Sequence, residues 1–169
     1  MTRRGFLATA ALAGTTALPA REAGGLRMRL LGAWRLVEAV TVYDTGATGP
    51  WYDRPGPYTG LIIYDVSGAM SVQIASARPA ARSPPQFGDM APAEQLKYLH
   101  TYYAYFGRFE LDESRSEVRH LVTTSLDPTE LGVTYTQKVD LEKDRLTLVT
   151  QPWRGPGGRQ HSRLIWMRA

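Results

Sequence analysis

Apolar and polar residues alternate over short runs in most of the chain after residue 30, and these runs are rich in Val, Ile, Leu, Tyr and Trp. Clusters of Gly, Pro, Asp and Ser separate the runs, which is typical of β-strands joined by turns. Ser67-Gly68, between two such runs, has the composition of a two-residue hairpin turn. The pattern predicts eight strands, at residues 31–43, 58–66, 69–75, 105–112, 117–124, 133–142, 145–150 and 159–168.

One helix interrupts the predicted strands, after a loop at residues 78–88 that contains three prolines. Pro92 suits the first position of a helix, and Glu94 suits the positive end of the helix dipole. The apolar residues that recur at helical spacing are Leu96, Leu99, Tyr103 and Phe106. We therefore expect a short helix from about residue 92 to residue 102.

Strands that are joined to their sequence neighbours by short turns form an antiparallel meander. Eight such strands close into an up-and-down barrel, whose interior has room for one small ligand. The predicted fold class is therefore all-β, an eight-stranded antiparallel barrel with one short helix, and an open β-sandwich is the alternative. The length of 169 residues fits a single domain.

The first 20 residues have the features of a secretory leader. Arg3-Arg4 is followed by one spacer and then by Phe6-Leu7, which is the twin-arginine pattern, and an uncharged, Ala-rich stretch continues to Leu18. This stretch is too short for a stable membrane span. We expect residues 1–20 to be a twin-arginine signal peptide that directs a domain of residues 26–169 to the periplasm or outside the cell. An amphipathic helix of the domain is the alternative, and the cleavage position stays open.

Composition excludes several classes of function. The chain has no cysteine, which rules out disulfides, thiolate metal sites and a thiol nucleophile. Beyond residue 20 it carries 18 Lys and Arg against 16 Asp and Glu, spread singly, so nucleic acid is not an expected partner. The Gly-x-Ser-x-Gly elbow, the His-Glu-x-x-His zinc motif and the phosphate-binding loop are missing. We expect no cofactor, and the sequence leaves the oligomeric state open.

Several segments together resemble one protein family. Gly32-Ala33-Trp34, near the start of the first predicted strand, is similar to the Gly-x-Trp opening of lipocalin-type barrels. The segments whose order and spacing extend the likeness are residues 60–64, 68–73, 103–110, 137–138, 144–148 and 162–168. The chain therefore resembles the bacterial and fungal lipocalin-like domain family over nearly all of residues 31–168. The resemblance implies a lipocalin-like barrel, and it implies little about chemistry.

The resemblance also implies a structural pair. In such barrels the tryptophan near the start fills one end, and a basic residue near the end of the last strand packs over its ring, which a cation–π contact favours. Here those positions are Trp34 and Arg168. The chain departs from the family's pattern at Arg119-His120, where members often have two histidines. Chemistry that depends on the first of those histidines is therefore absent from this chain.

The alternation of side chains along a strand gives a first assignment of the barrel interior. If Trp34 points inward, Glu38 does so too, and a buried charge needs a partner. Either an internal arginine pairs with Glu38 or a bulge shifts the register. Arg163, in the last strand, is a candidate anchor for the carboxylate of an acidic head group, because its forked donors match two oxygens. The alternative for Arg163 is an ion pair with a residue such as Glu110 or Glu38.

His120 lies on an apolar-leaning strand face and is the best candidate for general acid–base catalysis as well as for ligand binding. A satisfied core histidine is the alternative. His100 and His161 are not spaced for a metal site with His120, so no metal is expected. The tyrosines around residues 98–105 either line a cavity or fix the helix to the barrel. The further polar residues expected in the pocket are Tyr64, Gln73, Tyr105 and Gln137.

Three functions remain open. The first is an exported protein that binds a small apolar or acidic-headed molecule in the barrel. The second is a cofactor-independent isomerase, cyclase or dehydratase, which predicts that His120 meets a carboxylate or a tyrosine within hydrogen-bond reach. The third is a filled barrel that serves as an interaction module, which predicts no cavity and an exposed apolar patch.

Overall fold

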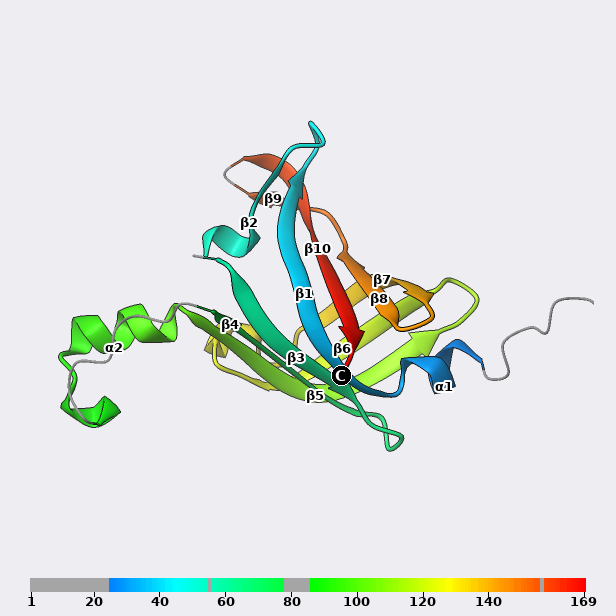
Figure 1. The fold of residues 1–169 in the computed structure, drawn as a ribbon, viewed down its shortest axis with the longest axis horizontal. Coiled ribbons are helices and arrows are strands. Elements are labelled where there is room, and N and C mark those ends of the chain that lie inside the picture. The colour runs from blue at the N-terminus through cyan, green and yellow to red at the C-terminus, as the bar shows by residue number, and fades with distance from the viewer. Residues whose placement is uncertain (1–24, 55, 78–85, 156) are drawn as a thin grey trace, which may run out of the picture.

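A computed structural model describes residues 25–54, 56–77, 86–155 and 157–169 (Figure 1). The predicted signal peptide at residues 1–20 lies outside these ranges. The helices are α1 (Leu26–Leu30), α2 (Pro92–Leu99) and the single-turn 3₁₀ helices η1 (Trp51–Asp53), η2 (Phe87–Asp89) and η3 (Pro128–Glu130). The strands are β1 (Gly32–Tyr43), β2 (Thr48–Pro50), β3 (Tyr58–Tyr64), β4 (Ala69–Ser76), β5 (Tyr102–Asp112), β6 (Glu117–Ser125), β7 (Thr134–Glu142), β8 (Arg145–Thr150), β9 (Trp153–Gly155) and β10 (Gly158–Arg168).

The sheet closes into a barrel. The strands pair antiparallel in the order β1-β3-β4-β5-β6-β7-β8-β10, and β1 also pairs with β10, from Trp34 opposite Arg168 to Tyr43 opposite Gln160. This pairing confirms the eight-stranded barrel and excludes the open sandwich. The short strands β2 and β9 extend β1 and β10 at one rim. Neither α1 nor α2, the two α-helices in the described part of the chain, is long and apolar enough to cross a bilayer.

The barrel interior is filled by alternate side chains of every strand, as the period of two requires. The sequence alternation therefore locates the core well for β3, β4 and β6. The largest side chains that are fully buried are Trp34, Trp166, Tyr64, Leu30, Ile62, Leu146, Leu148 and His120.

A β-bulge breaks the alternation in β1. The register against β10 shifts between Leu36 and Glu38, which lie opposite Trp166 and Ile165. One extra residue moves every following side chain to the other face. Ala39 is therefore the next buried position after Leu36, which confirms the bulge that the sequence leaves as one of two alternatives.

The bulge also settles the position of Glu38. Its carboxylate lies on the outer wall, 3.3 Å from Arg163 on the neighbouring strand. Both side chains are about 40% exposed, so water screens the pair. The bulge and the ion pair, which the sequence leaves as alternatives, are thus both present, but the ion pair is outside the barrel.

The predicted helix begins at Pro92 as expected but is shorter than expected. It ends at Leu99, and Tyr103 and Phe106 belong to β5. Backbone pairing of Tyr103 with Ile74 on β4 outweighs the coincidental helical spacing of these aromatics. No residue of α2 is buried, and the helix projects away from the barrel (Figure 1).

The end of the barrel next to α1 is closed by a dense set of contacts. The Arg168 guanidinium lies 3.9 Å from the centre of the Trp34 ring, which confirms the predicted pair. Arg168 donates to the carbonyl oxygens of Leu31 and Arg29, each at 2.6 Å, and the Trp34 indole N–H donates to Leu30 at 2.8 Å. The sequence pattern did not predict the short helix α1. This helix and its C-cap residue place these carbonyl groups and the fully buried Leu30 over the barrel end.

Candidate functional site

A narrow cavity lies inside the barrel beneath η1, which is at the other end of β1 from α1 (Figure 1). Its volume is about 40 Å³, roughly the space of three water molecules. Most of the wall is aromatic and aliphatic. The residues that line it are Trp51, Tyr52, Ile62, Val72, Ile74, Tyr103, Tyr105, His120, Tyr135, Gln137, Leu148, Thr150, Ser162, Leu164 and Trp166.

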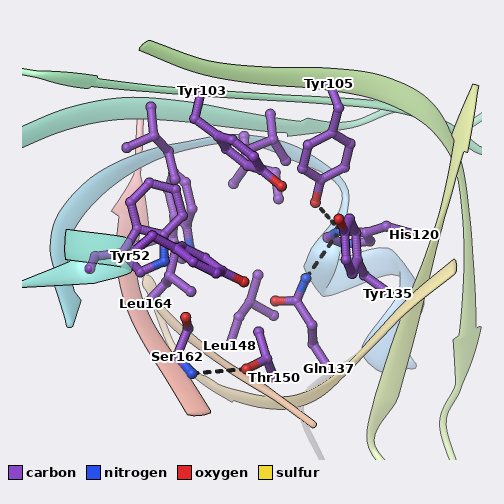
Figure 2. Close-up of a pocket in the computed structure, with 15 residues that line it drawn as sticks. Tyr52, Tyr103, Tyr105, His120, Tyr135, Gln137, Leu148, Thr150, Ser162 and Leu164 are labelled. Carbon is purple, nitrogen blue, oxygen red and sulfur yellow. Dashed lines mark hydrogen bonds between the residues drawn. The ribbon is translucent and has the colours of Figure 1, made fainter. Parts of the chain in front are cut away.

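His120 is the centre of a buried polar network on this wall (Figure 2). Its Nδ1 atom is 2.6 Å from the Tyr105 hydroxyl and 3.2 Å from the Gln137 amide nitrogen. Its Nε2 atom is 2.8 Å from the Tyr64 hydroxyl. The four side chains come from β3, β5, β6 and β7, so the network joins three neighbouring strands to β3, which lies beyond β4.

The network is electrically neutral. Burial lowers the pKa of His120 to about 3, and it raises the pKa values of Tyr64 and Tyr105 well above 10. The Gln137 amide nitrogen can only donate, so Nδ1 of His120 is the ring atom without a hydrogen. Nε2 then carries the hydrogen and donates it to Tyr64.

A second polar group lies at the mouth of the cavity, around Glu130 of η3. The Tyr103 hydroxyl donates to Glu130 Oε1 at 3.0 Å, and the Ser125 hydroxyl donates to Oε2 at 2.6 Å. The Arg54 guanidinium lies 5.6 Å from the centre of the Tyr103 ring. Burial raises the pKa of Tyr103, as it does that of Tyr135 beside it, so both phenols keep their protons.

The helical turn η1 covers the cavity. Trp51 is buried and packs edge-on against Tyr58 and Tyr103, at ring-centre distances of 6.0 and 5.3 Å. Tyr52 stacks on Trp153 of β9 at 5.3 Å and points its hydroxyl into the cavity (Figure 2). Tyr52 has a φ of 49°, a left-handed conformation that costs a non-glycine residue about 1 kcal/mol or more. Packing on both sides therefore holds this turn in a strained backbone conformation.

Two buried indole nitrogens in the cavity wall, Trp51 Nε1 and Trp166 Nε1, have no hydrogen-bond partner within the described residues. Ser162 Oγ points toward the Tyr52 hydroxyl (Figure 2). A buried donor without an acceptor is costly, and native proteins keep very few of them. A water molecule or a ligand in the cavity would satisfy them.

The structure brings together three of the six predicted ligand-binding residues. Tyr105, His120 and Gln137 line the cavity, and Tyr64 lies directly behind His120. The other two, Gln73 and Arg163, were placed in the interior incorrectly.

Gln73 and Arg163 lie on the outer wall because strand alternation places their neighbours inside. Val72 and Ile74 are the inward residues of β4 there, and the exposed Gln73 accepts a hydrogen bond from Tyr102 at 3.3 Å. In β10 the inward residues are Ser162 and Leu164, while Arg163 pairs with Glu38.

Sequence reasoning missed several lining residues. Trp51 and Tyr52 fall in a Gly- and Pro-rich loop, where two adjacent aromatic residues were the available signal. Ser162 lies on the same strand face as Arg168, so the expected Trp34–Arg168 pair could have located it. For Tyr135, nothing in the sequence indicates a place in the cavity wall beyond its position in a predicted strand.

Among the described residues there is no group of three or more His, Asp or Glu side chains arranged to hold a metal ion. His120 uses both ring nitrogens within the network. The part of the cavity wall that the structure describes also contains no Lys, Arg, Asp or Glu. The site is therefore suited to a neutral molecule.

Comparison with protein families identifies the architecture independently. The model of the lipocalin-like domain family matches residues 31–169, which is most of the chain and the whole barrel from the start of β1. Comparison with curated proteins finds no match.

Proposed function

Because this chain belongs to the family of lipocalin-like domains, we propose that its barrel binds a small, neutral and largely apolar molecule in the cavity around His120. The observation that carries the proposal is the neutral network of His120, Tyr105 and Gln137 on an otherwise aromatic and aliphatic wall. A few polar groups among apolar walls are the usual composition of a small-molecule site.

The proposal favours a neutral ligand over an acidic-headed one. Arg163, the predicted anchor for a carboxylate, lies outside the barrel. A carboxylate in a dry cavity without a cationic partner costs several kcal/mol. The described lining residues offer it only neutral groups.

The ligand enters by displacing η1. At about 40 Å³ the cavity holds water but no ligand-sized molecule, whose sites usually measure about 300 Å³ or more. The side chain that fills the mouth is Tyr52. Because its left-handed backbone is strained, we expect Tyr52 to move out of the mouth once its stacking on Trp153 is lost.

The binding proposal is tested by native mass spectrometry of the protein exported with its own leader. We expect a small molecule to travel with the wild-type protein and to be absent from Ser162→Leu, which fills the cavity from β10. Arg163→Leu makes the same kind of change at the next position, on the outer wall, and is the matched control. A clean apo mass for the wild type, with no thermal shift against neutral aromatic compounds, would support the filled interaction module instead.

A second candidate, the cofactor-independent isomerase, cyclase or dehydratase, is favoured by one contact. His120 meets Tyr105 at 2.6 Å, as an acid–base pair requires. The directions of the pKa shifts oppose it, because the phenol holds its proton more tightly than usual and the imidazole accepts one less readily. A His120→Gln variant that binds the captured molecule but no longer converts it would favour the enzyme over the binder.

We also propose that the protein acts outside the cytoplasm, on the basis of Arg3-Arg4 and the apolar stretch that follows. Replacing both arginines by lysine should leave the protein in the cytoplasm of a bacterial host, measured by fractionation. A single Arg27→Lys change in α1 is the control and should not alter the location. Equal export of the double variant would contradict twin-arginine transport.

A further inference from the structure

Two groups on the β5 and β7 side of the cavity direct their hydrogens away from it. Tyr105 and Gln137 both donate to Nδ1 of His120, which carries no hydrogen because the Gln137 amide nitrogen beside it can only donate. The Tyr105 oxygen therefore offers only lone pairs to the cavity. Figure 2 shows the Gln137 amide with its nitrogen toward His120 and its oxygen on the cavity side.

The same arrangement occurs at the mouth, on the same strand as Tyr105. Tyr103 donates its proton to the carboxylate of Glu130, which can only accept. The Tyr103 oxygen, like the Tyr105 oxygen, is left with lone pairs. Three groups from β5 and β7 thus present acceptors to one part of the cavity.

The unpartnered donors come from other elements. Trp51 Nε1 in η1 and Trp166 Nε1 in β10 are buried N–H groups without an acceptor among the described residues. An indole nitrogen can only donate. The cavity therefore has an acceptor wall, formed by Tyr103, Tyr105 and Gln137, and separate donors on Trp51 and Trp166.

We infer that the ligand is an uncharged apolar molecule with a hydroxyl or N–H group that donates to the acceptor wall, such as a phenol, an aromatic alcohol or an indole-like N–H compound. This inference rests on the proposed binding function and specifies its ligand class. Methylation of the ligand's hydroxyl or N–H group keeps the ring but removes the hydrogen. The methylated atom then faces the lone pairs of the acceptor wall and has no hydrogen to donate. A ligand whose only polar atom is a carbonyl oxygen is disfavoured at this wall for the same reason.

The experiment compares matched pairs of probes by titration with the tryptophan fluorescence of the purified protein as readout. The pairs are phenol with anisole and 2-naphthol with 2-methoxynaphthalene, and 2-acetylnaphthalene supplies a carbonyl without a donor. We expect each hydroxyl compound to bind at least about tenfold more tightly than its methyl ether, the ratio that corresponds to loss of one hydrogen bond inside the site. The ketone can accept from the Trp51 or Trp166 N–H but cannot donate to the acceptor wall, so it should bind less tightly than the hydroxyl compounds.

Two variants test whether the acceptor wall causes the preference for the hydroxyl compound over its methyl ether. Tyr105→Phe and Gln137→Leu each remove one acceptor, and each should reduce the hydroxyl-to-ether ratio several-fold. Tyr102→Phe is the matched control, because it removes a hydroxyl that donates to Gln73 on the outer wall, outside the cavity lining. It should keep the wild-type ratio. Thermal melts of all three variants identify any that fail to fold, and one folded wall variant is sufficient for the comparison.

The outcomes separate the inference from the function on which it rests. Tight binding of the ether or the ketone, equal to that of the hydroxyl compound, leaves the barrel as a binding protein but overturns the acceptor wall. Equal loss of the ratio in Tyr102→Phe also overturns it, because the effect then does not come from atoms that face the ligand. Binding of none of the five probes, together with a clean apo mass, overturns both.

Discussion

The two ends of the barrel use similar residues in opposite ways. At the end next to α1, Trp34 has an acceptor for its indole N–H and the Arg168 guanidinium has two. At the end beneath η1, Trp51 is equally buried, but its indole N–H has no acceptor among the described residues. Trp166, which lines the cavity from β10 opposite Leu36, has none there either. Since a fully satisfied polar group stabilises a fold and an unsatisfied one costs free energy, the first end is built for stability. The second end has buried N–H donors that a molecule in the cavity can satisfy.

The largest test of this difference replaces tryptophan at each end. Trp34→Ala should lower the free energy of unfolding by about 3–5 kcal/mol, because it leaves a cavity under Arg168 and removes the cation–π contact. Trp153→Ala, which removes only the stacking partner of Tyr52, should cost about 1 kcal/mol. Urea denaturation of both variants measures the two values. Equal losses would mean that both ends contribute alike to stability.

The second test uses pH, and it addresses the cavity end alone. In the unfolded chain His120 has a pKa near 6.5, and in the fold burial lowers it to about 3. Below pH 6.5 the unfolded chain therefore binds one more proton, so stability falls as the pH falls and is complete only above that pH. Between pH 7 and pH 5 the loss from this group should be about 2 kcal/mol.

The control for the pH test is His120→Gln, which has no titrating group at this position. The window above pH 5 also avoids the carboxylates of Asp65, Asp112 and Asp127, whose pKa values are lowered by nearby hydrogen bonds. The difference between wild type and variant, from urea midpoints at pH 7, 6 and 5, isolates His120. Parallel curves would show that His120 is accessible to protons in the folded protein.

The fold was predictable because its largest signals are local. Alternation and the Ser67-Gly68 turn specify the strands, and the Gly-x-Trp segment locates the closed end of the barrel. The helix was too long in the prediction because Tyr103 and Phe106 fit a helical period by chance. Their pairing with β4 is a tertiary contact, which no local window contains.

The candidate site was only partly predictable for a related reason. His120 follows from alternation in a regular strand, whereas Gln73 and Arg163 were assigned to the interior although alternation in β4 and β10 directs them outward. Tyr52 reaches the cavity through a left-handed turn of η1, and such a conformation in a residue other than glycine leaves no mark in the pattern. The residues that close the mouth are thus the ones that sequence reasoning finds last.

A smaller test sharpens the account of the closed end. Arg168→Lys keeps the charge but cannot donate in a fork to both Leu31 and Arg29 while lying over Trp34. We expect a loss of about 1–2 kcal/mol in the free energy of unfolding and no change in probe binding. Arg29→Lys, on α1 beside it, should cost less than half as much. A change in the affinity of 2-naphthol in Arg168→Lys would mean that the two ends are coupled.

The smallest expected effect concerns Arg163, which belongs to neither end. Its ion pair with Glu38 spans 3.3 Å on the outer wall, and both side chains are about 40% exposed. Arg163→Gln should therefore change the free energy of unfolding by less than about 0.5 kcal/mol and leave ligand affinity unaltered. Glu38→Gln should behave alike, and the double variant should add no further loss. A loss of affinity in Arg163→Gln alone would restore the acidic-headed ligand, because only an inward guanidinium could bind its carboxylate.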